Sequence, residues 1–153
     1  MWSFISSLAL IAAVQGRAAH EEQAKEFEIM NEAMMRHGSD YTWEAHEVKT
    51  NDGYILTMFR IVGDQNGEQI PYQGSKGPLL LQHGFLTDSI SWFHFSDESK
   101  PALPVRLFQE GFDVWLGNNR GTMNSRGHVK LDPDVDHSFW DFSHHHFAAF
   151  DIP

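Results

Sequence analysis

The stretch Leu79-Leu80-Leu81-Gln82-His83-Gly84-Phe85 decides the fold class. Its three leucines do not alternate with polar residues, a pattern typical of a parallel strand with apolar cover on both faces. Pro78 precedes the run and Gly84 follows it, so the strand has a defined beginning and end. We therefore expect a central parallel strand from Leu79 to Gln82 that opens onto a loop at His83.

The next segments complete a strand–helix–strand unit. Residues Pro101 to Glu110 favour a helix, with Pro104 near its first turn and Gly111 as its stop signal. A second apolar strand is predicted from Phe112 to Leu116, and it ends in the loop Gly117-Asn118-Asn119-Arg120-Gly121. Parallel strands joined by a helix form a right-handed crossover by default. This order indicates an α/β protein.

An antiparallel hairpin is predicted upstream of this unit. The segment from Trp43 to Thr50 leads into the turn Asn51-Asp52-Gly53, and the following residues from Tyr54 to Ile61 alternate in the way of a strand. The glycine-rich stretch from Gly63 to Gly77 is typical of a polar surface loop.

Two more helices are expected near the ends of the chain. Residues Glu21 to His37 favour a helix on which Phe27, Met30 and Met34 recur at three- and four-residue intervals. We expect this apolar stripe to pack on the core rather than to face lipid. Residues Ser138 to Phe150 predict a second helix that begins at a serine cap.

Composition excludes several classes of function. The 11 basic and 21 acidic side chains give a net charge of −10 without a basic cluster, which argues against a nucleic-acid partner. An apolar content of 41% is typical of a packed domain rather than a disordered chain. Cysteine is absent, which excludes a disulfide framework, a thiolate zinc site and a cysteine nucleophile.

The N-terminus is typical of a secretory signal peptide. Phe4 to Val14 is mostly apolar, and small residues follow around Gly16. A membrane span needs roughly 20 apolar residues, so this stretch is too short to be one. We therefore predict a signal peptide over residues 1–16 and a secreted or lysosomal domain over residues 17–153; a buried N-terminal helix is the alternative.

The candidates for chemistry lie beyond the two predicted parallel strands. Ligands of open α/β sheets bind at the carboxyl ends of the strands, where the His83 and Gly117 loops are expected to be neighbours. Gly84 lets the backbone turn sharply and leaves the N–H of Phe85 free to face a developing oxyanion. A glycine at a strand end is also an ordinary turn residue, so this pair alone leaves both interpretations open.

Other polar groups give weaker signals. The histidines His144, His145 and His146 would point about 100° apart on a helix, so no metal site is expected there. The alternating aspartates between Asp132 and Asp136 lack the glycine and closing glutamate of a calcium loop and predict a solvated acidic loop.

Two further features leave alternatives open. Arg120 could bind an anion, or it could brace the loops beside the site. The aromatic residues Trp92, Phe93 and Phe95 could line a path for an acyl chain, or they could pack beneath the following helix.

Over nearly its whole mature length the chain resembles the acid lipase family of α/β-hydrolases, the group of gastric and lysosomal lipases. Four blocks in the family's order and spacing carry the resemblance: Glu47 to Leu56, Leu80 to Phe85, Asp113 to Gly121, and Phe139 to Ser143 with Asp151-Ile152-Pro153. The resemblance implies an incomplete α/β-hydrolase fold, made of the N-terminal hairpin plus the first parallel strands and helices of the sheet.

The resemblance also implies roles for residues of the two loops. Phe85 matches the position whose backbone N–H is one arm of the family's oxyanion hole. His83 and Gly84 support that loop, and His83 does not match the base of the catalytic triad. The positions that match structural residues beside the site are Asn118, Arg120 and Gly121.

By the same resemblance the intact protein would hydrolyse triacylglycerols or cholesteryl esters with a Ser-Asp-His triad and no cofactor. No serine of this chain lies in G-x-S-x-G, and the family's nucleophile follows the segment that ends at Pro153. We therefore expect the N-terminal part of a lipase, inactive and poorly soluble by itself. The alternative is a secreted, non-enzymatic module that binds lipid or a partner protein and melts cooperatively as a monomer.

Overall fold

The computed structural model describes residues 27–37, 41–64, 76–94 and 100–152. The predicted signal peptide lies outside these residues, as do the first part of the helix expected from Glu21, most of the glycine-rich loop, and Phe95.

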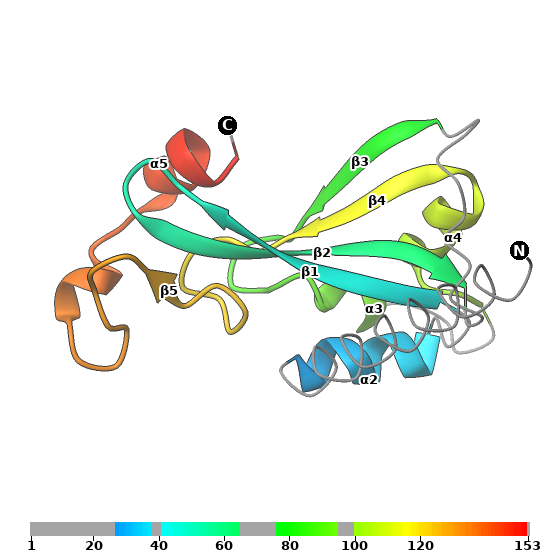
Figure 1. Cartoon of the computed structure of the whole chain (residues 1–153), viewed down its shortest axis with the longest axis horizontal. Coiled ribbons are helices and arrows are strands. Elements are labelled where there is room, and N and C mark those ends of the chain that lie inside the picture. Colours follow the sequence, from blue (N-terminus) through cyan, green and yellow to red (C-terminus); the bar gives the residue numbers. More distant parts are fainter. Residues whose placement is uncertain (1–26, 38–40, 65–75, 95–99, 153) are drawn as a thin grey trace, which may run out of the picture.

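A twisted mixed sheet forms the centre of the molecule (Figure 1). Its strands are β1 (Tyr41–Lys49), β2 (Tyr54–Asp64), β3 (Gly77–Gln82), β4 (Phe112–Gly117) and the short β5 (Gly127–His128). The order is β1-β2-β4-β3, with β5 paired to the start of β2. β1 pairs antiparallel with β2, β2 pairs antiparallel with β4, and β3 pairs parallel with β4. This mixture of strands and helices confirms the α/β class, whereas β5 was not predicted.

The hairpin turn forms where the sequence predicts it. The Thr50 hydroxyl donates to the Asp52 carboxylate at 2.6 Å and accepts from the Tyr54 N–H at 2.9 Å, which closes the turn. Gly53 has φ +101°, and a Cβ there would lie 2.9 Å from the side chains of His128 and Val129. Only glycine meets both demands, the backbone conformation and the close approach of the β5 strand.

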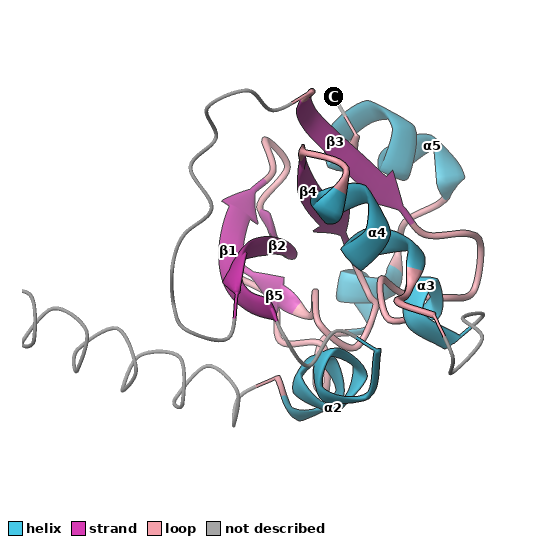
Figure 2. Ribbon diagram, turned by 90° about the vertical axis from the view of Figure 1, so that its right-hand side faces the viewer, coloured by secondary structure: helices cyan, strands magenta, loops and turns pink. Residues whose placement is uncertain are grey.

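Three helices pack against one face of the sheet (Figure 2): α2 (Glu28–His37), α3 (Ser91–His94) and α4 (Leu103–Gln109). Their shared core is made of large apolar side chains that are almost fully buried: Met30, Met34, Trp43, Phe59, Ile61, Ile90, Phe93, Val105, Val114 and Leu116. The predicted packing of the α2 stripe on the core is confirmed, and Phe93 packs beside α4 rather than lining an open path. No helix in the part of the chain described above is long and apolar enough to cross a membrane.

The prediction that β3 has apolar cover on both faces is wrong for the described residues. β3 is the last strand in the sheet order, and Leu80 is 46% exposed. Side chains alternate between the two faces of a strand. Leu81 packs against the helical core, while Leu80 pairs with Trp115 on the face that α2, α3 and α4 do not cover.

The single helix predicted from Ser138 to Phe150 is also wrong. The segment forms a 3-10 turn, η1 (His137–Trp140), a single helical turn, α5 (His144–His146), and a π turn, η2 (Phe147–Asp151). The backbone breaks at Asp141, and Ser143 rather than Ser138 caps the second part.

A second small core explains this break. Phe139 is fully buried against Tyr54 and Leu56, with Leu131 and Phe142 packed around them. The Tyr54 hydroxyl donates to the Phe139 carbonyl at 2.5 Å, a carbonyl that a continuing helix would bond within itself. Tertiary packing therefore overrides the helical periodicity of the sequence.

Candidate functional site

β3 and β4 end side by side, because Gln82 pairs with Gly117 in the parallel register. A Cβ on Gly117 would lie 2.3 Å from the Gln82 amide oxygen, so only glycine lets the Gln82 side chain fold over the neighbouring strand. The Gln82 amide then donates to the Asn119 side-chain oxygen at 3.0 Å. The two loops are thus tied together at the point where both strands stop, as the sequence predicts.

His83 provides the second tie between the loops. Its Nε2 accepts from the backbone N–H of Asn119 at 3.1 Å, which requires a lone pair on Nε2. The ring proton therefore sits on Nδ1, from which it donates to the carbonyl of Gly84 at 2.8 Å. This nearly buried ring has both nitrogens engaged in fixing backbone.

Gly84, Phe85 and Leu86 project from these ties towards solvent. The Phe85 side chain is 67% exposed and its ring lies 4.6 Å from the His144 ring, while Leu86 is 88% exposed. The N–H of Phe85 has no hydrogen-bond partner among residues 27–37, 41–64, 76–94 and 100–152. We call residues 83–87 the Phe85 loop. It presents a free backbone donor at the carboxyl end of β3, the position expected of an oxyanion-binding group.

The side chain of Asn118 anchors the loop that follows β4. Its buried side chain accepts from the Ser89 N–H and donates to the Thr57 carbonyl, each at 3.0 Å. Ser125 completes the arrangement, because its hydroxyl accepts from the Thr57 N–H and donates to the Asn118 carbonyl. These contacts join β2, the β4 loop and the segment before α3.

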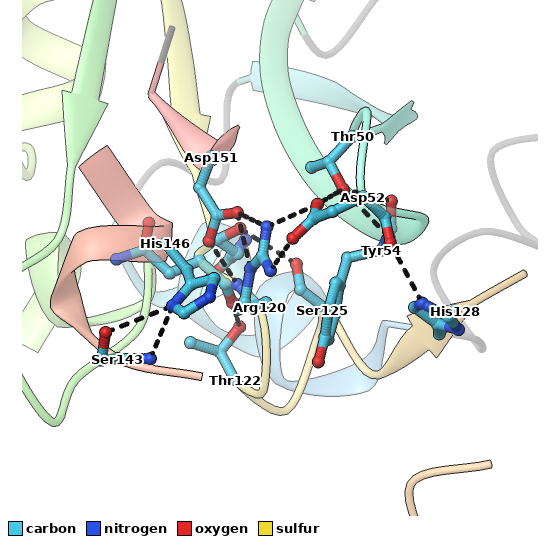
Figure 3. Close-up of polar contacts among 12 residues, drawn as sticks. Thr50, Asp52, Tyr54, Arg120, Thr122, Ser125, His128, Ser143, His146 and Asp151 are labelled. Atoms are coloured by element: carbon cyan, nitrogen blue, oxygen red, sulfur yellow. Dashed lines mark hydrogen bonds and ion pairs between the residues drawn. The ribbon is translucent and has the colours of Figure 1, made fainter. Parts of the chain in front are cut away.

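Arg120 lies between two carboxylates, as Figure 3 shows. Its guanidinium donates to Asp52 through both terminal nitrogens, at 2.5 and 3.0 Å, and its Nε donates to Asp151 at 2.8 Å. The backbone N–H of Arg120 also donates to Asp151, at 3.0 Å. The guanidinium stacks over the Tyr54 ring, 4.0 Å from its centroid. Asp52, Tyr54, Arg120 and Asp151 together are called the Arg120 cluster.

The electrostatics of the cluster follow from burial and ion pairing. Burial opposes charge on Asp52, but hydrogen bonds from Arg120 and Thr50 outweigh it and leave the pKa of Asp52 below its ordinary value. Burial likewise opposes charge on Arg120, yet its two carboxylates raise its pKa. Burial raises the pKa of Tyr54, so the phenol stays protonated. The cluster pairs one guanidinium with two carboxyl groups, so its acidic groups outnumber its basic group by one.

The partners of Arg120 were missed by sequence reasoning. Asp52 was assigned only to the hairpin turn, and Asp151 was recognised only as part of a block. The two aspartates are 99 positions apart in the sequence, so no local spacing relates them. With two carboxylates already on the guanidinium, the geometry favours bracing over the binding of an external anion.

The other candidates bond mainly within their own segments, although the His144 ring lies against that of Phe85. His146 accepts from the Ser143 N–H through Nδ1 and so caps α5. Asp132 and Asp136 bond backbone N–H groups of their own loop. Within the described ranges, no group of three His, Cys, Asp or Glu side chains is arranged to hold a metal ion.

Comparison with known proteins places this arrangement in context. Residues 32–95 match the model of a partial alpha/beta-hydrolase lipase region. The chain is 41% identical over 113 residues to triacylglycerol lipase 2 of Arabidopsis thaliana, covering 74% of this chain and 26% of that protein. It is 41% identical over 125 residues to lipase member M of Mus musculus, covering 82% and 28%. It is 37% identical over 124 residues to gastric triacylglycerol lipase of Bos taurus, covering 81% and 30%. The chain thus spans less than a third of the length of these relatives.

Proposed function

Since the chain is the N-terminal portion of an acid lipase, with an incomplete α/β-hydrolase fold, we propose that it supplies the oxyanion-binding loop of a site that hydrolyses carboxylic esters of neutral lipids. The observation that carries this proposal is the unpartnered N–H of Phe85 at the carboxyl end of β3. It lies on a loop held by His83 and by the adjoining β4 loop. A donor fixed in this way can stabilise the negative charge that develops on the ester carbonyl oxygen.

The substrate class rests on the relatives and on the loop. Two of the relatives cited above are named triacylglycerol lipases. The side chains of Phe85 and Leu86 are exposed at the same loop, where an acyl chain can contact them. We take triacylglycerol or cholesteryl ester as the substrate of the intact protein. The lipase relatives do not favour the alternative of a non-enzymatic binding module.

The nucleophile of this reaction lies outside the chain in our proposal. No serine here occupies a G-x-S-x-G turn, and an oxyanion donor without an attacking group cannot cleave an ester. The last strand of the described sheet, β3, would then pair with the strand that leads into the nucleophile. Residues 1–16 would act as a signal peptide that directs the protein to the lysosome or out of the cell.

The test compares the chain with the continuous gene product that extends beyond Pro153. A G-x-S-x-G sequence is expected within about 40 residues of Pro153. The longer protein should hydrolyse p-nitrophenyl butyrate and emulsified triacylglycerol, whereas the chain of 153 residues should hydrolyse neither. Ester hydrolysis by the short chain, or its absence from the long one, contradicts the proposal.

The role of the Phe85 N–H is tested by a matched pair of variants in the longer protein. Phe85→Pro removes the donor at a turn position that proline favours, and Phe85→Leu keeps it. Loss of one oxyanion donor lowers kcat by about 10²–10³-fold. We expect that loss for Phe85→Pro and less than about tenfold for Phe85→Leu. Equal activity of the two variants would assign the oxyanion role to another group.

A further inference from the structure

The direction of the Phe85 N–H is set by the carbonyl of the preceding residue. The peptide bond between Gly84 and Phe85 is planar and trans, so its C=O and N–H groups point in opposite directions. Whatever holds the Gly84 oxygen on one side therefore aims the Phe85 N–H on the other.

Two side chains hold that oxygen. His83 Nδ1 donates to it at 2.8 Å and the hydroxyl of Thr87 donates to it at 2.9 Å. A carbonyl oxygen has two lone pairs, and these bonds use both. His83 is itself fixed from the other side by Asn119, whereas Thr87 holds the oxygen from within the loop.

The backbone of the loop makes this second bond important. Leu86 has φ +59°, in the left-handed region that residues with a Cβ rarely adopt. In many turns the N–H of the fourth residue bonds the carbonyl of the first. Phe85 and Leu86 are the central residues of such a turn, and the Thr87 hydroxyl adds a side-chain bond to the same carbonyl.

From this geometry we propose that Thr87 is a positioning residue, whose hydroxyl clamps the Gly84 carbonyl and so aims the Phe85 N–H at the reacting ester. The proposal rests on the oxyanion role of Phe85 put forward above. Thr87 does not touch substrate in this scheme. It acts through the peptide between Gly84 and Phe85, and it directly follows Leu86, the residue with positive φ.

The clamp can be measured directly by isotope labelling. The sequence contains two Gly-Phe pairs, Gly84-Phe85 and Gly111-Phe112, so 13C-carbonyl glycine with 15N phenylalanine gives two correlated NMR signals in the chain. The Gly111 carbonyl accepts from the Lys76 N–H and makes no contact with Thr87, which makes it an internal control. Magic-angle spinning gives the same signals from sedimented protein.

Thr87→Val removes the hydroxyl at nearly constant shape, and Thr87→Ser keeps it. We expect an upfield shift of the Gly84 carbonyl signal in Thr87→Val, recovery in Thr87→Ser, and no change at Gly111. An unchanged Gly84 signal in Thr87→Val overturns the clamp.

Kinetics of the longer, nucleophile-bearing protein test the consequence. Thr87→Val should lower kcat about tenfold with KM unchanged, less than the loss of the donor itself, and Thr87→Ser should restore it. A shifted Gly84 signal with unchanged kcat in an active enzyme overturns the positioning role. If the wild-type longer protein is inactive, the proposed function fails, and the Gly84 signal still decides whether Thr87 orients the peptide.

Discussion

Arg120 and Phe85 lie in neighbouring loops at one end of the sheet, yet their surroundings are opposite. The Arg120 side chain is fully buried between two carboxylates, while the Phe85 side chain is 67% exposed and its N–H is unpartnered in the described structure. Both loops contain a residue with positive φ, but the Arg120 loop places Gly121 there and the Phe85 loop places Leu86. In the loop of Arg120 a glycine takes the positive φ and the guanidinium is ion-paired. The Phe85 loop instead has an unpartnered backbone donor and a strained leucine, and such strain is common at functional sites.

We expect the Arg120 cluster to contribute more to stability than the Phe85 loop, because its guanidinium is the shared counter-ion of two carboxylates. A guanidinium without its carboxylates, or carboxylates without their guanidinium, would leave uncompensated charge in the interior. Asp52 comes from the hairpin turn and Asp151 from the last described turn, so the cluster also joins distant parts of the chain (Figure 3).

The largest effect is therefore expected for Arg120→Met. Asp151 is 1% exposed and Asp52 is 25% exposed, and both lose their counter-ion. Breaking a buried ion pair from one side costs about 3–5 kcal/mol, and we expect that loss in the free energy of unfolding measured in urea.

Arg126→Met is the matched control for this comparison. Arg126 also pairs with an aspartate and lies over an aromatic ring, that of Trp140, but its pair with Asp134 is exposed, 39% and 78% for the two side chains. An exposed pair contributes about 0–1 kcal/mol. Equal losses for the two arginine variants would show that burial of the Arg120 cluster has no energetic consequence.

The sequence predicts the local parts of both regions and not the contacts between them. The turn at Gly53, the strand before His83 and the stop at Gly111 depend on neighbouring residues, and each lies where it is predicted. The pairing of Arg120 with Asp52 and Asp151 depends on the whole fold, and composition and spacing contain no signal for it. All three residues lie in the blocks that resemble the acid lipase family, but the order and spacing of those blocks do not indicate which residues are in contact.

The positive-φ residues of the two loops, Gly121 and Leu86, provide a second contrast, of intermediate size. Gly121 has φ +80°, and a Cβ there would lie 2.7 Å from the Phe142 ring, so Gly121→Ala should cost about 2 kcal/mol through strain and crowding. Leu86 is 88% exposed, so Leu86→Gly relieves strain and loses little packing. After the entropy cost of glycine, a gain of about 0.5 kcal/mol is expected.

Urea denaturation of the two variants measures both signs. A destabilised Leu86→Gly variant would show that the side chain of Leu86 stabilises the fold by more than its left-handed backbone conformation destabilises it. An unchanged Gly121→Ala variant would show that the Phe142 and Trp140 rings move aside and that the backbone at this position relaxes from φ +80°.

The same rings explain why the C-terminal segment could not be predicted. The aromatic spacing from Ser138 to Phe150 suits one helix, but Phe139 is fully buried against Tyr54, and a ring of Phe142 lies over Gly121. Both contacts need the chain to turn at Asp141.

Leu80 of β3 shows a second limit of sequence patterns. An unbroken apolar run predicts that both faces of a strand are buried, but the described helices cover only one face of β3.

The smallest effect is the pH dependence of stability within the Arg120 cluster. The pKa of Asp52 is lowered from 3.8 in the folded state, so its contribution to stability is complete above pH 3.8 and is lost as pH falls through the folded value. The pKa of Tyr54 is raised from 10.0, so its contribution is complete below pH 10.0 and is lost as pH rises through the folded value.

Two variants, each the control of the other, separate the acid part of this pH dependence from the alkaline part. Asp52→Asn should flatten the dependence of the unfolding free energy on pH below 3.8, and Tyr54→Phe should flatten it above 10.0. Tyr54→Phe also loses the hydrogen bond to the Phe139 carbonyl, a loss that lowers stability equally at acid and neutral pH and so leaves the acid slope intact. An acid slope that persists in Asp52→Asn would mean that carboxylates other than Asp52 set the acid stability of the fold, and the contrast between the ion-paired Arg120 cluster and the exposed Phe85 loop would then not rest on Asp52.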